Sequence, residues 1–273
     1  MKNFQGQKVL ITGGSSGIGR ATARLLAEQG AAVWLIARRK EALEETLAEL
    51  RPFCAPGDCG ILPADVSDPL QVTEAVEKMA SLAGCPDMVI NSAGITRPGY
   101  SYEHSLEVYR RIMEVNYFGT LHVIQAVLPC MLGRGSGHIV NISSLAGVVG
   151  VFGYAAYGAS KYAVMGLSEV LRAELKPKGI RVSVVLPPDT DTPQLAWEAP
   201  LKPPETKAIA GSAKVLPPEQ VARAILRGVQ RGRFLILPGF DSKAIYWVSR
   251  LLGPAQYPLL DFLARRAPQP RNP

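Results

Sequence analysis

The chain has 273 residues, of which 47% are hydrophobic and 19% charged, a composition typical of a globular protein with one substantial core. Its net charge of +7 is concentrated in the C-terminal quarter, because residues 1–199 carry a net charge of −1 and residues 200–273 a net charge of +8. This asymmetry indicates either an anionic partner, such as a membrane surface, or simply solvated Lys and Arg side chains. No nucleic-acid-binding motif accompanies it, so we expect no nucleic-acid partner.

At the N-terminus, only Met1 to Gln7 precede the first strand-like segment. No run along the chain approaches the roughly 20 apolar residues of a membrane-spanning helix. We therefore expect neither a signal peptide nor a spanning anchor, and a cytoplasmic location.

Short apolar segments then alternate with longer segments of helical periodicity, the pattern of parallel βαβ units. Predicted strands cover Lys8–Ile11, Ala32–Ile36, Gly60–Pro63, Met88–Ile90, His138–Ile142, Ile180–Leu186 and Phe234–Leu237. Predicted helices cover Gly17–Gln29, Glu41–Leu50, Val72–Leu82, Leu106–Met131, Tyr154–Leu175 and Pro218–Arg231. The sequence thus predicts an α/β fold: a doubly wound, seven-stranded parallel sheet of the Rossmann type over residues 1–240, with a C-terminal helical extension.

Two segments lie outside this alternation. Residues 187–218 are rich in proline and irregular, and we interpret them as a substrate lid, because long loops in compact domains are usually functional or mobile. Residues 241–273 form an apolar and basic extension, in which Trp247 and the Tyr257–Leu263 segment are flanked by Lys and Arg. It is expected either to dock peripherally on an anionic membrane near the lid or to pack against the core or another subunit.

A glycine-rich loop follows the first predicted strand and leads into a helix. Gly13 would permit its tight turn, Gly17 would let backbone N–H groups approach a pyrophosphate, and Gly19 would allow close helix packing. The strand-loop-helix setting therefore predicts a dinucleotide site with the spacing Gly-x3-Gly-x-Gly. The residues expected to bind the cofactor here are Gly13, Ser15, Ser16, Gly17, Ile18 and Gly19.

Charge at the end of the second predicted strand indicates which cofactor is bound. An acidic residue there would hydrogen-bond the adenosine ribose of NAD, but Arg38 and Arg39 occupy the position. An arginine can pair bidentately with a 2′-phosphate, so the sequence favours NADPH/NADP, with Arg38 as the stronger candidate.

Tyr157 and Lys161 lie four residues apart at the start of a predicted helix, and hence on one face of it. Hydride delivery to a carbonyl leaves an alkoxide, which needs a nearby proton donor. Tyrosine is a weak acid with a pKa of about 10, and a neighbouring ammonium is expected to bring that pKa toward working pH. Alone, such a pair is usually a coincidence of surface residues. Together with the glycine-rich loop, Asn91 and Ser144 it favours a carbonyl reductase, with the cofactor performing the redox step.

The glycine spacing and the Tyr-x3-Lys pair together resemble the short-chain dehydrogenase/reductase family. By this resemblance Ser144, 13 residues before Tyr157, is the serine that hydrogen-bonds the substrate oxygen, in preference to Ser143. Asn116 would organise a water path to Tyr157, and Lys161 would also hold the nicotinamide ribose. Further cofactor contacts implied by the resemblance are Asp65 and Val66 after the third strand, and Asn91, Ala93 and Gly94 after the fourth.

Within the family, the segments Phe152–Tyr157 and Pro187–Pro193 resemble 3-ketodihydrosphingosine reductases, and the similarity runs from about residue 8 to about residue 230. Pro187, Thr190 and Thr192 would then contact the cofactor, Thr192 at the nicotinamide amide. Pro188 replaces the glycine usual in the family, which removes an N–H and fixes φ.

Three functional hypotheses follow. The substrate is a long-chain ketone, 3-ketodihydrosphingosine, or it is another carbonyl compound such as a 3-oxoacyl thioester, a steroid or a small ketone. A catalytically silent nucleotide-sensing scaffold is the third, and the complete set of catalytic residues argues against it. Family resemblance also favours a homo-oligomer, either a dimer or a tetramer.

The four cysteines are scattered along the chain, and Cys54 and Cys59 alone do not make a four-ligand metal set. We therefore expect no metal site. Because the protein is expected in the cytoplasm, its thiols are expected to be reduced.

Overall fold

A computed structural model describes residues 4–210 and 214–258 and contains the predicted seven-stranded parallel sheet. The strands are β1 Lys8–Thr12, β2 Ala32–Ala37, β3 Gly60–Pro63, β4 Met88–Asn91, β5 Gly137–Ile142, β6 Ile180–Val185 and β7 Leu235–Ile236. Their order is β3-β2-β1-β4-β5-β6-β7, and every neighbouring pair is parallel. The order reverses between β1 and β4, where a doubly wound sheet opens a crevice for ligands.

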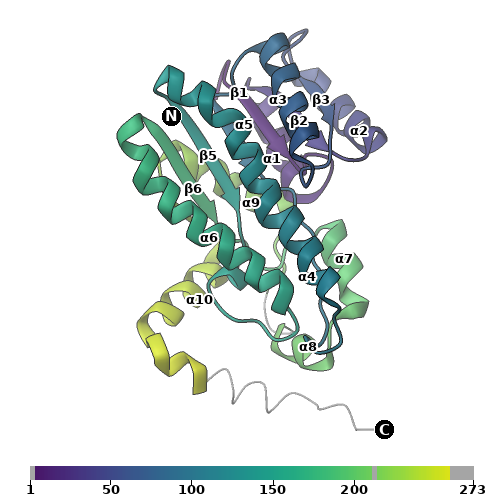
Figure 1. The fold of residues 1–273 in the computed structure, drawn as a ribbon, viewed down its shortest axis with the longest axis vertical. Coiled ribbons are helices and arrows are strands. Elements are labelled where there is room, and N and C mark those ends of the chain that lie inside the picture. The colour runs from purple at the N-terminus through teal and green to yellow at the C-terminus, as the bar shows by residue number, and fades with distance from the viewer. Residues whose placement is uncertain (1–3, 211–213, 259–273) are drawn as a thin grey trace.

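Helices cover both faces of the sheet (Figure 1). They are α1 Gly17–Ala27, α2 Lys40–Leu50, α3 Pro69–Ala83, α4 Leu106–Met113, α5 Gly119–Arg134, α6 Ala155–Leu175, α7 Pro193–Glu198, α8 Pro204–Ala210, α9 Pro218–Gln230 and α10 Gly239–Leu252. One core cluster contains residues of α1, α2 and α9, and a second contains residues of α3, α5 and α6. The strands are therefore buried on both sides, which explains why they read as continuous apolar runs.

The long helix predicted over Leu106–Met131 is continuous but not regular. A π-helical segment, Glu114–Phe118, separates α4 from α5. Together they form one helix that is long and apolar enough, by length and composition alone, to cross a membrane. No such helix was expected from the sequence. Val123, Val127 and Met131 are fully buried in the core, and 44% of the apolar stretch of this helix is buried, so packing inside the protein accounts for part of its apolar character.

The expectation of reduced thiols is wrong, because the structure joins all four cysteines in disulfides, Cys54–Cys59 and Cys85–Cys130. The first closes the short loop before β3. The second links the end of α3 to α5, two helices that pack together. The Cys85–Cys130 pairing depends on the packing of α3 against α5, which sequence spacing does not show, whereas Cys54 and Cys59 are neighbours in one loop.

The predicted lid contains two short helices, α7 and α8, on the side of the sheet formed by the strand carboxyl ends. The extension begins as α10, whose Ser242 and Tyr246 are buried. Tyr246 packs with Met165, Val184 and Leu186 in a small core cluster. Residues 259–273, with most of the Tyr257–Leu263 segment, lie outside the described residues.

Candidate active site

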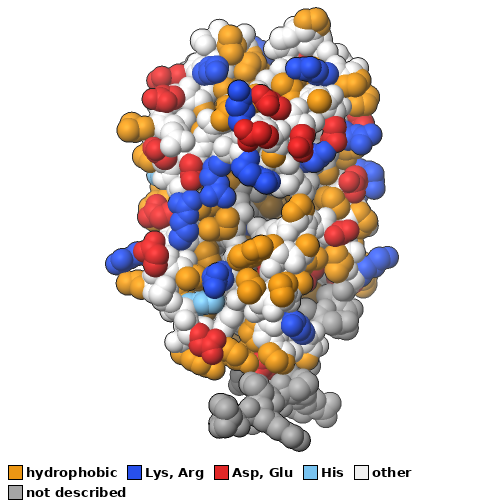
Figure 2. Space-filling model, turned by 90° about the vertical axis from the view of Figure 1, so that its right-hand side faces the viewer, with side chains coloured by type: hydrophobic (Ala, Val, Ile, Leu, Met, Phe, Trp, Pro, Cys, Tyr) orange, Lys and Arg blue, Asp and Glu red, His pale blue; other side chains and the backbone are white. Residues whose placement is uncertain are grey.

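A cavity of about 680 Å³ opens at the carboxyl ends of the strands. Figure 2 shows a hollow on this face, with Lys and Arg side chains gathered along one rim and hydrophobic side chains along the other. Its walls come from the glycine-rich loop, the loops after β4 and β5, the start of α6, the lid segment and α10. Segments far apart in the sequence thus meet at one site, as the parallel topology requires.

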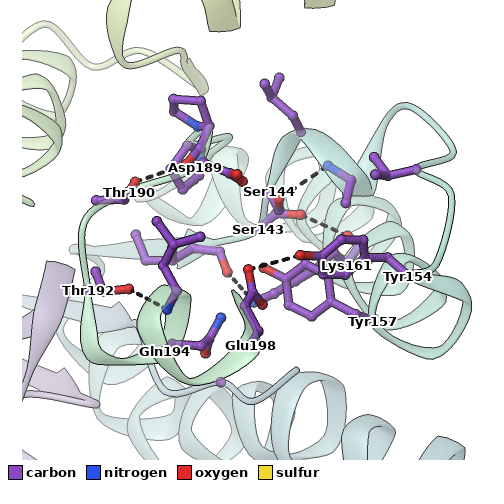
Figure 3. A pocket seen from close by; sticks show the side chains of 18 of the residues that line it. Ser143, Ser144, Tyr154, Tyr157, Lys161, Asp189, Thr190, Thr192, Gln194 and Glu198 are labelled. Atoms are coloured by element: carbon purple, nitrogen blue, oxygen red, sulfur yellow. Dashed lines mark hydrogen bonds between the residues drawn. The ribbon is translucent and has the colours of Figure 1, made fainter. Parts of the chain in front are cut away.

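Tyr157, Lys161 and Ser144 line this cavity together, as predicted (Figure 3). The Lys161 ammonium lies 5.6 Å from the centroid of the Tyr157 ring and donates a 2.9 Å hydrogen bond to the carbonyl of Ile142. Ser144 lies close enough to lower the pKa of Tyr157 as a hydrogen-bonding group, and its hydroxyl accepts the N–H of Ala146. The three polar groups that a carbonyl reduction needs are therefore placed side by side.

Burial dominates the proton affinities of these groups. It raises the pKa of Tyr157 above its ordinary value of 10; the hydrogen bond from Ser144 opposes this shift, whereas the negative charges of Glu198 and Asp189 add to it. Burial lowers the pKa of Lys161 to about 8. The expectation that Lys161 brings the Tyr157 pKa down is therefore wrong for this structure, and Tyr157 is held as a neutral phenol, the form that can give a proton.

Asn116 lies in the π-helical segment and is fully buried. Its amide oxygen accepts the N–H of Ile95 at 2.8 Å, and its amide nitrogen donates to the carbonyl of Ile95 and to the Ser160 hydroxyl, both at 2.9 Å. Ser160 in turn donates to the carbonyl of Tyr157 at 2.7 Å. Asn116 therefore fixes the first turn of α6 through Ser160, a connection that no sequence motif reveals. Its role in a water path stays a prediction.

The glycine-rich loop packs directly on its neighbours. Gly13 has φ +66°, and a Cβ there would lie 2.8 Å from the nitrogen of Ala93. A Cβ on Gly19 would lie 2.3 Å from the carbonyl oxygen of Gly13, so this glycine serves close packing, as predicted. The hydroxyl of Thr12, to which no role was assigned from sequence, accepts the N–H groups of Ser92 and Ala93 at 3.1 Å.

Most of the other predicted cofactor residues also line the cavity. They are Gly13, Ser16, Gly17, Ile18, Ala93, Gly94, Pro187, Thr190 and Thr192. Thr192 faces the glycine-rich loop, since a Cβ on Gly17 would lie 2.9 Å from its methyl group. This contact joins the start of α7 to the predicted phosphate site, which fits a lid that covers a bound dinucleotide.

Several predicted cofactor residues do not line the cavity. Asn91 is buried between strands, where it donates to the side chain of Asn141 at 2.9 Å, so its role here is structural. Val66 is buried, against Gly119. Asp65 accepts hydrogen bonds from Ser67 and pairs with Arg111 at 3.1 Å. Burial alone would raise the pKa of Asp65, but these partners outweigh it and lower that pKa.

The end of β2 is where the sequence predicts that an adenosine ribose binds. Arg38 and Arg39 are exposed there and do not line the cavity. Ser15, in the neighbouring glycine-rich loop, is half-buried and does not line the cavity either. Neither arginine forms an ion pair with any described residue, so both guanidinium groups are available to a phosphate. The donors present thus fit a dinucleotide, with glycine backbone at its centre and cationic groups at one end.

Such a site, with a phenol, an ammonium and a hydroxyl beside a dinucleotide loop, defines an oxidoreductase acting on the CH–OH/C=O pair. Residues 7–200 match the family described as short chain dehydrogenase, and the chain belongs to this family.

Relatives of known name share most of its length. The chain is 37% identical to a "3-ketodihydrosphingosine reductase" of Dictyostelium discoideum, with 95% of this chain and 83% of the relative covered. It is 39% identical to a "3-dehydrosphinganine reductase" of Danio rerio, with 85% and 70% covered.

Solved structures agree with the fold. The crystal structure of levodione reductase superposes with a TM-score of 0.80 at 28% identity, over 89% of this chain and 100% of the other. A short-chain dehydrogenase/reductase from Burkholderia phymatum in complex with NAD gives 0.80 at 26% identity over 100% of both chains. The fold and family predicted from the sequence are confirmed, and the cofactor is a nicotinamide dinucleotide.

Replacing Tyr157 by Phe should lower kcat/KM by about 100-fold or more while cofactor affinity stays nearly unchanged, because the variant loses the proton donor and keeps the ring. Lys161→Ala should reduce both activity and cofactor affinity. Steady-state kinetics and fluorescence titration with cofactor measure the two effects. A Tyr157→Phe enzyme that kept more than a few per cent of wild-type kcat/KM would contradict the assignment.

Proposed function

We propose that the protein uses NADPH to reduce 3-ketodihydrosphingosine to dihydrosphingosine. The observation that carries the proposal is the cavity, in which Tyr157 and Ser144 lie between the glycine-rich loop and a wall of apolar side chains. Apolar lining residues include Leu145, Val149, Val151, Phe152, Leu195 and Ile245. The names of the relatives from Dictyostelium discoideum and Danio rerio support the same substrate. The alternative substrates are a 3-oxoacyl thioester, a steroid and a small ketone.

Each side chain has a separate part in the reduction. The nicotinamide, when bound, supplies a hydride to the carbonyl carbon. Ser144 holds the carbonyl oxygen beside Tyr157, and Tyr157 gives its phenolic proton to the alkoxide as charge develops there. Lys161, anchored on the Ile142 carbonyl, places a positive charge next to the phenolate that Tyr157 leaves. The buried surroundings strengthen these electrostatic effects by excluding water.

NADPH is the proposed cofactor because the unpaired Arg38 at the end of β2 can bind a 2′-phosphate bidentately. An acidic residue at this place would repel that phosphate, and none stands at positions 37 to 40. Arg39 caps the start of α2, where a cation is disfavoured unless an anion is nearby. A bound phosphate would remove that penalty.

We also propose that α10 docks the protein on an anionic membrane surface, from which a lipid substrate could enter the cavity. Phe240, Trp247 and Leu251 recur at helical spacing along α10 and are 81%, 56% and 83% exposed. Lys243 and Arg250 are exposed on the same helix and would face lipid phosphates. Ile245 and Asp241 line the cavity, so the same helix reaches both places. The alternative is that another subunit of a dimer or tetramer covers Phe240, Trp247 and Leu251.

The substrate is tested by following NADPH oxidation with 3-ketodihydrosphingosine beside a short 3-oxoacyl thioester. We expect kcat/KM for the sphingoid ketone to exceed that for the thioester by at least about 10-fold, because only the former fills the apolar cavity. Equal turnover of both, or preference for the thioester, would refute the substrate and leave the reductase chemistry in place.

Arg38→Ala should weaken NADPH binding by about 1.5–3 kcal/mol and leave NADH binding nearly unchanged, since only NADPH carries the 2′-phosphate. Dissociation constants for both cofactors, measured by calorimetry, check this, with Lys40→Ala as the matched control because Lys40 already pairs with Glu44. Equal loss for both cofactors, or a wild-type preference for NADH, would overturn the NADPH assignment.

Membrane docking is tested by co-sedimentation with liposomes that contain phosphatidylserine. Binding should weaken with salt and should drop in a Trp247→Ser, Leu251→Ser double variant, whose buried Tyr246 anchor is untouched. Light scattering on both proteins reports the oligomeric state. Wild-type protein that stays in the supernatant at low salt, or a double variant that dissociates from a dimer without any change in liposome binding, would refute docking.

A further inference from the structure

Four polar side chains form a cluster in the wall of the cavity, apart from the catalytic residues. Glu198 ends α7, and its Oε1 accepts a 2.9 Å hydrogen bond from the Tyr154 hydroxyl and lies 3.3 Å from the Lys202 ammonium. The same ammonium lies 3.4 Å from Asp189. All four residues line the cavity. The site was not expected from the sequence, where Lys and Glu four residues apart are ordinary.

The charges in this cluster do not balance. Two carboxylates, Asp189 and Glu198, face one ammonium, which leaves one negative charge when all three groups are ionised. The Glu198 side chain is only 7% exposed, and that of Lys202 9%. Burial raises the pKa of Glu198, although Lys202 and Tyr154 oppose the shift. The Asp189 side chain is 39% exposed and so is solvated, whereas Glu198 is buried and shares the Lys202 ammonium with Asp189. A further cation beside Glu198 would therefore stabilise its buried charge.

Glu198 also has a free acceptor directed at the cavity. Both of its contacts fall on Oε1, so that Oε2 accepts no hydrogen bond from the described residues.

The cluster lies next to the reacting groups. The Tyr154 and Tyr157 rings are 5.8 Å apart between centroids, and Figure 3 shows the Glu198 carboxylate beside the Tyr157 ring. The charges of Glu198 and Asp189 both act on Tyr157. A group bound by Glu198 would therefore sit close to the carbonyl that Tyr157 protonates.

We propose that Glu198, supported by Asp189, binds an ammonium group on the carbon adjacent to the substrate carbonyl. The inference rests on the proposed function, because 3-ketodihydrosphingosine is a 2-amino ketone and carries its amine at that position. Glu198 would then be a specificity-determining residue that distinguishes amino ketones from plain ketones. Tyr154 and Lys202 are positioning residues, since they hold the Glu198 carboxylate through Oε1 and leave Oε2 for the substrate.

The test compares two ketones on two enzymes. The substrates are 3-ketodihydrosphingosine and the same molecule with hydrogen in place of the amine. Wild-type protein should prefer the amino ketone, and Glu198→Gln should lower this preference, the ratio of kcat/KM for the amino ketone to kcat/KM for the des-amino ketone, by about 10- to 100-fold. The glutamine keeps a carbonyl acceptor for Tyr154, but it removes the charge and replaces the second acceptor oxygen by an NH2 donor. A Glu198→Gln effect that is equal for both ketones would overturn the inference.

Glu205→Gln is the matched control. Glu205 is also a buried carboxylate that accepts a hydrogen bond from a tyrosine, Tyr100, at 3.0 Å, but it does not line the cavity. This variant should leave the ratio between the two ketones unchanged, and thermal melting confirms that both variants fold. A wild-type enzyme with no preference for the amine refutes the ammonium site alone. Wild-type failure to reduce either long-chain ketone refutes the proposed function, and the inference with it.

Discussion

Close backbone packing between the ends of β1 and β4 is the constraint on which the site depends. A side chain at Gly13 would collide with the backbone of Ala93, and the Thr12 hydroxyl holds the same segment through two N–H groups. This approach brings Gly94 near the catalytic groups, since a Cβ there would lie 3.5 Å from the Lys161 ammonium. The phosphate loop and the proton-transfer groups are therefore parts of one rigid assembly.

Burial sets the pKa values of the two proton-transfer groups in this assembly. The same burial that keeps Tyr157 protonated lowers the Lys161 pKa to about 8. Tyr157 therefore keeps the proton that it donates, whereas Lys161 loses its proton more easily than a solvated lysine. Near neutral pH, Lys161 is still charged for the most part. The direction of the tyrosine shift suits reduction, in which the enzyme must begin as a proton donor.

Local patterns accounted for much of the fold and of the catalytic set. Strand positions follow from apolar runs, and Tyr157 and Lys161 share a helix face because of their spacing. The Cys85–Cys130 disulfide, the pairing of Asp65 with Arg111 and the cluster around Glu198 depend on tertiary packing, so no local pattern contains them. The tyrosine pKa was misjudged for the same reason: a neighbouring ammonium is visible in the sequence, whereas burial and the carboxylates from the segment 187–218 are not.

The π-helical segment at Glu114–Phe118 sets an exact residue count for the helix that contains Asn116. A π-turn accommodates one residue more than a regular α-helical turn. Deleting one residue in this segment would let the helix become regular and leave α4 and α5 roughly in phase with each other. It would, however, shift Asn116, whose amide oxygen accepts the N–H of Ile95. The extra residue is therefore tied to the place of one buried amide, and we expect its loss to disturb the hydrogen bonds around Asn116 more than the packing of the two helices.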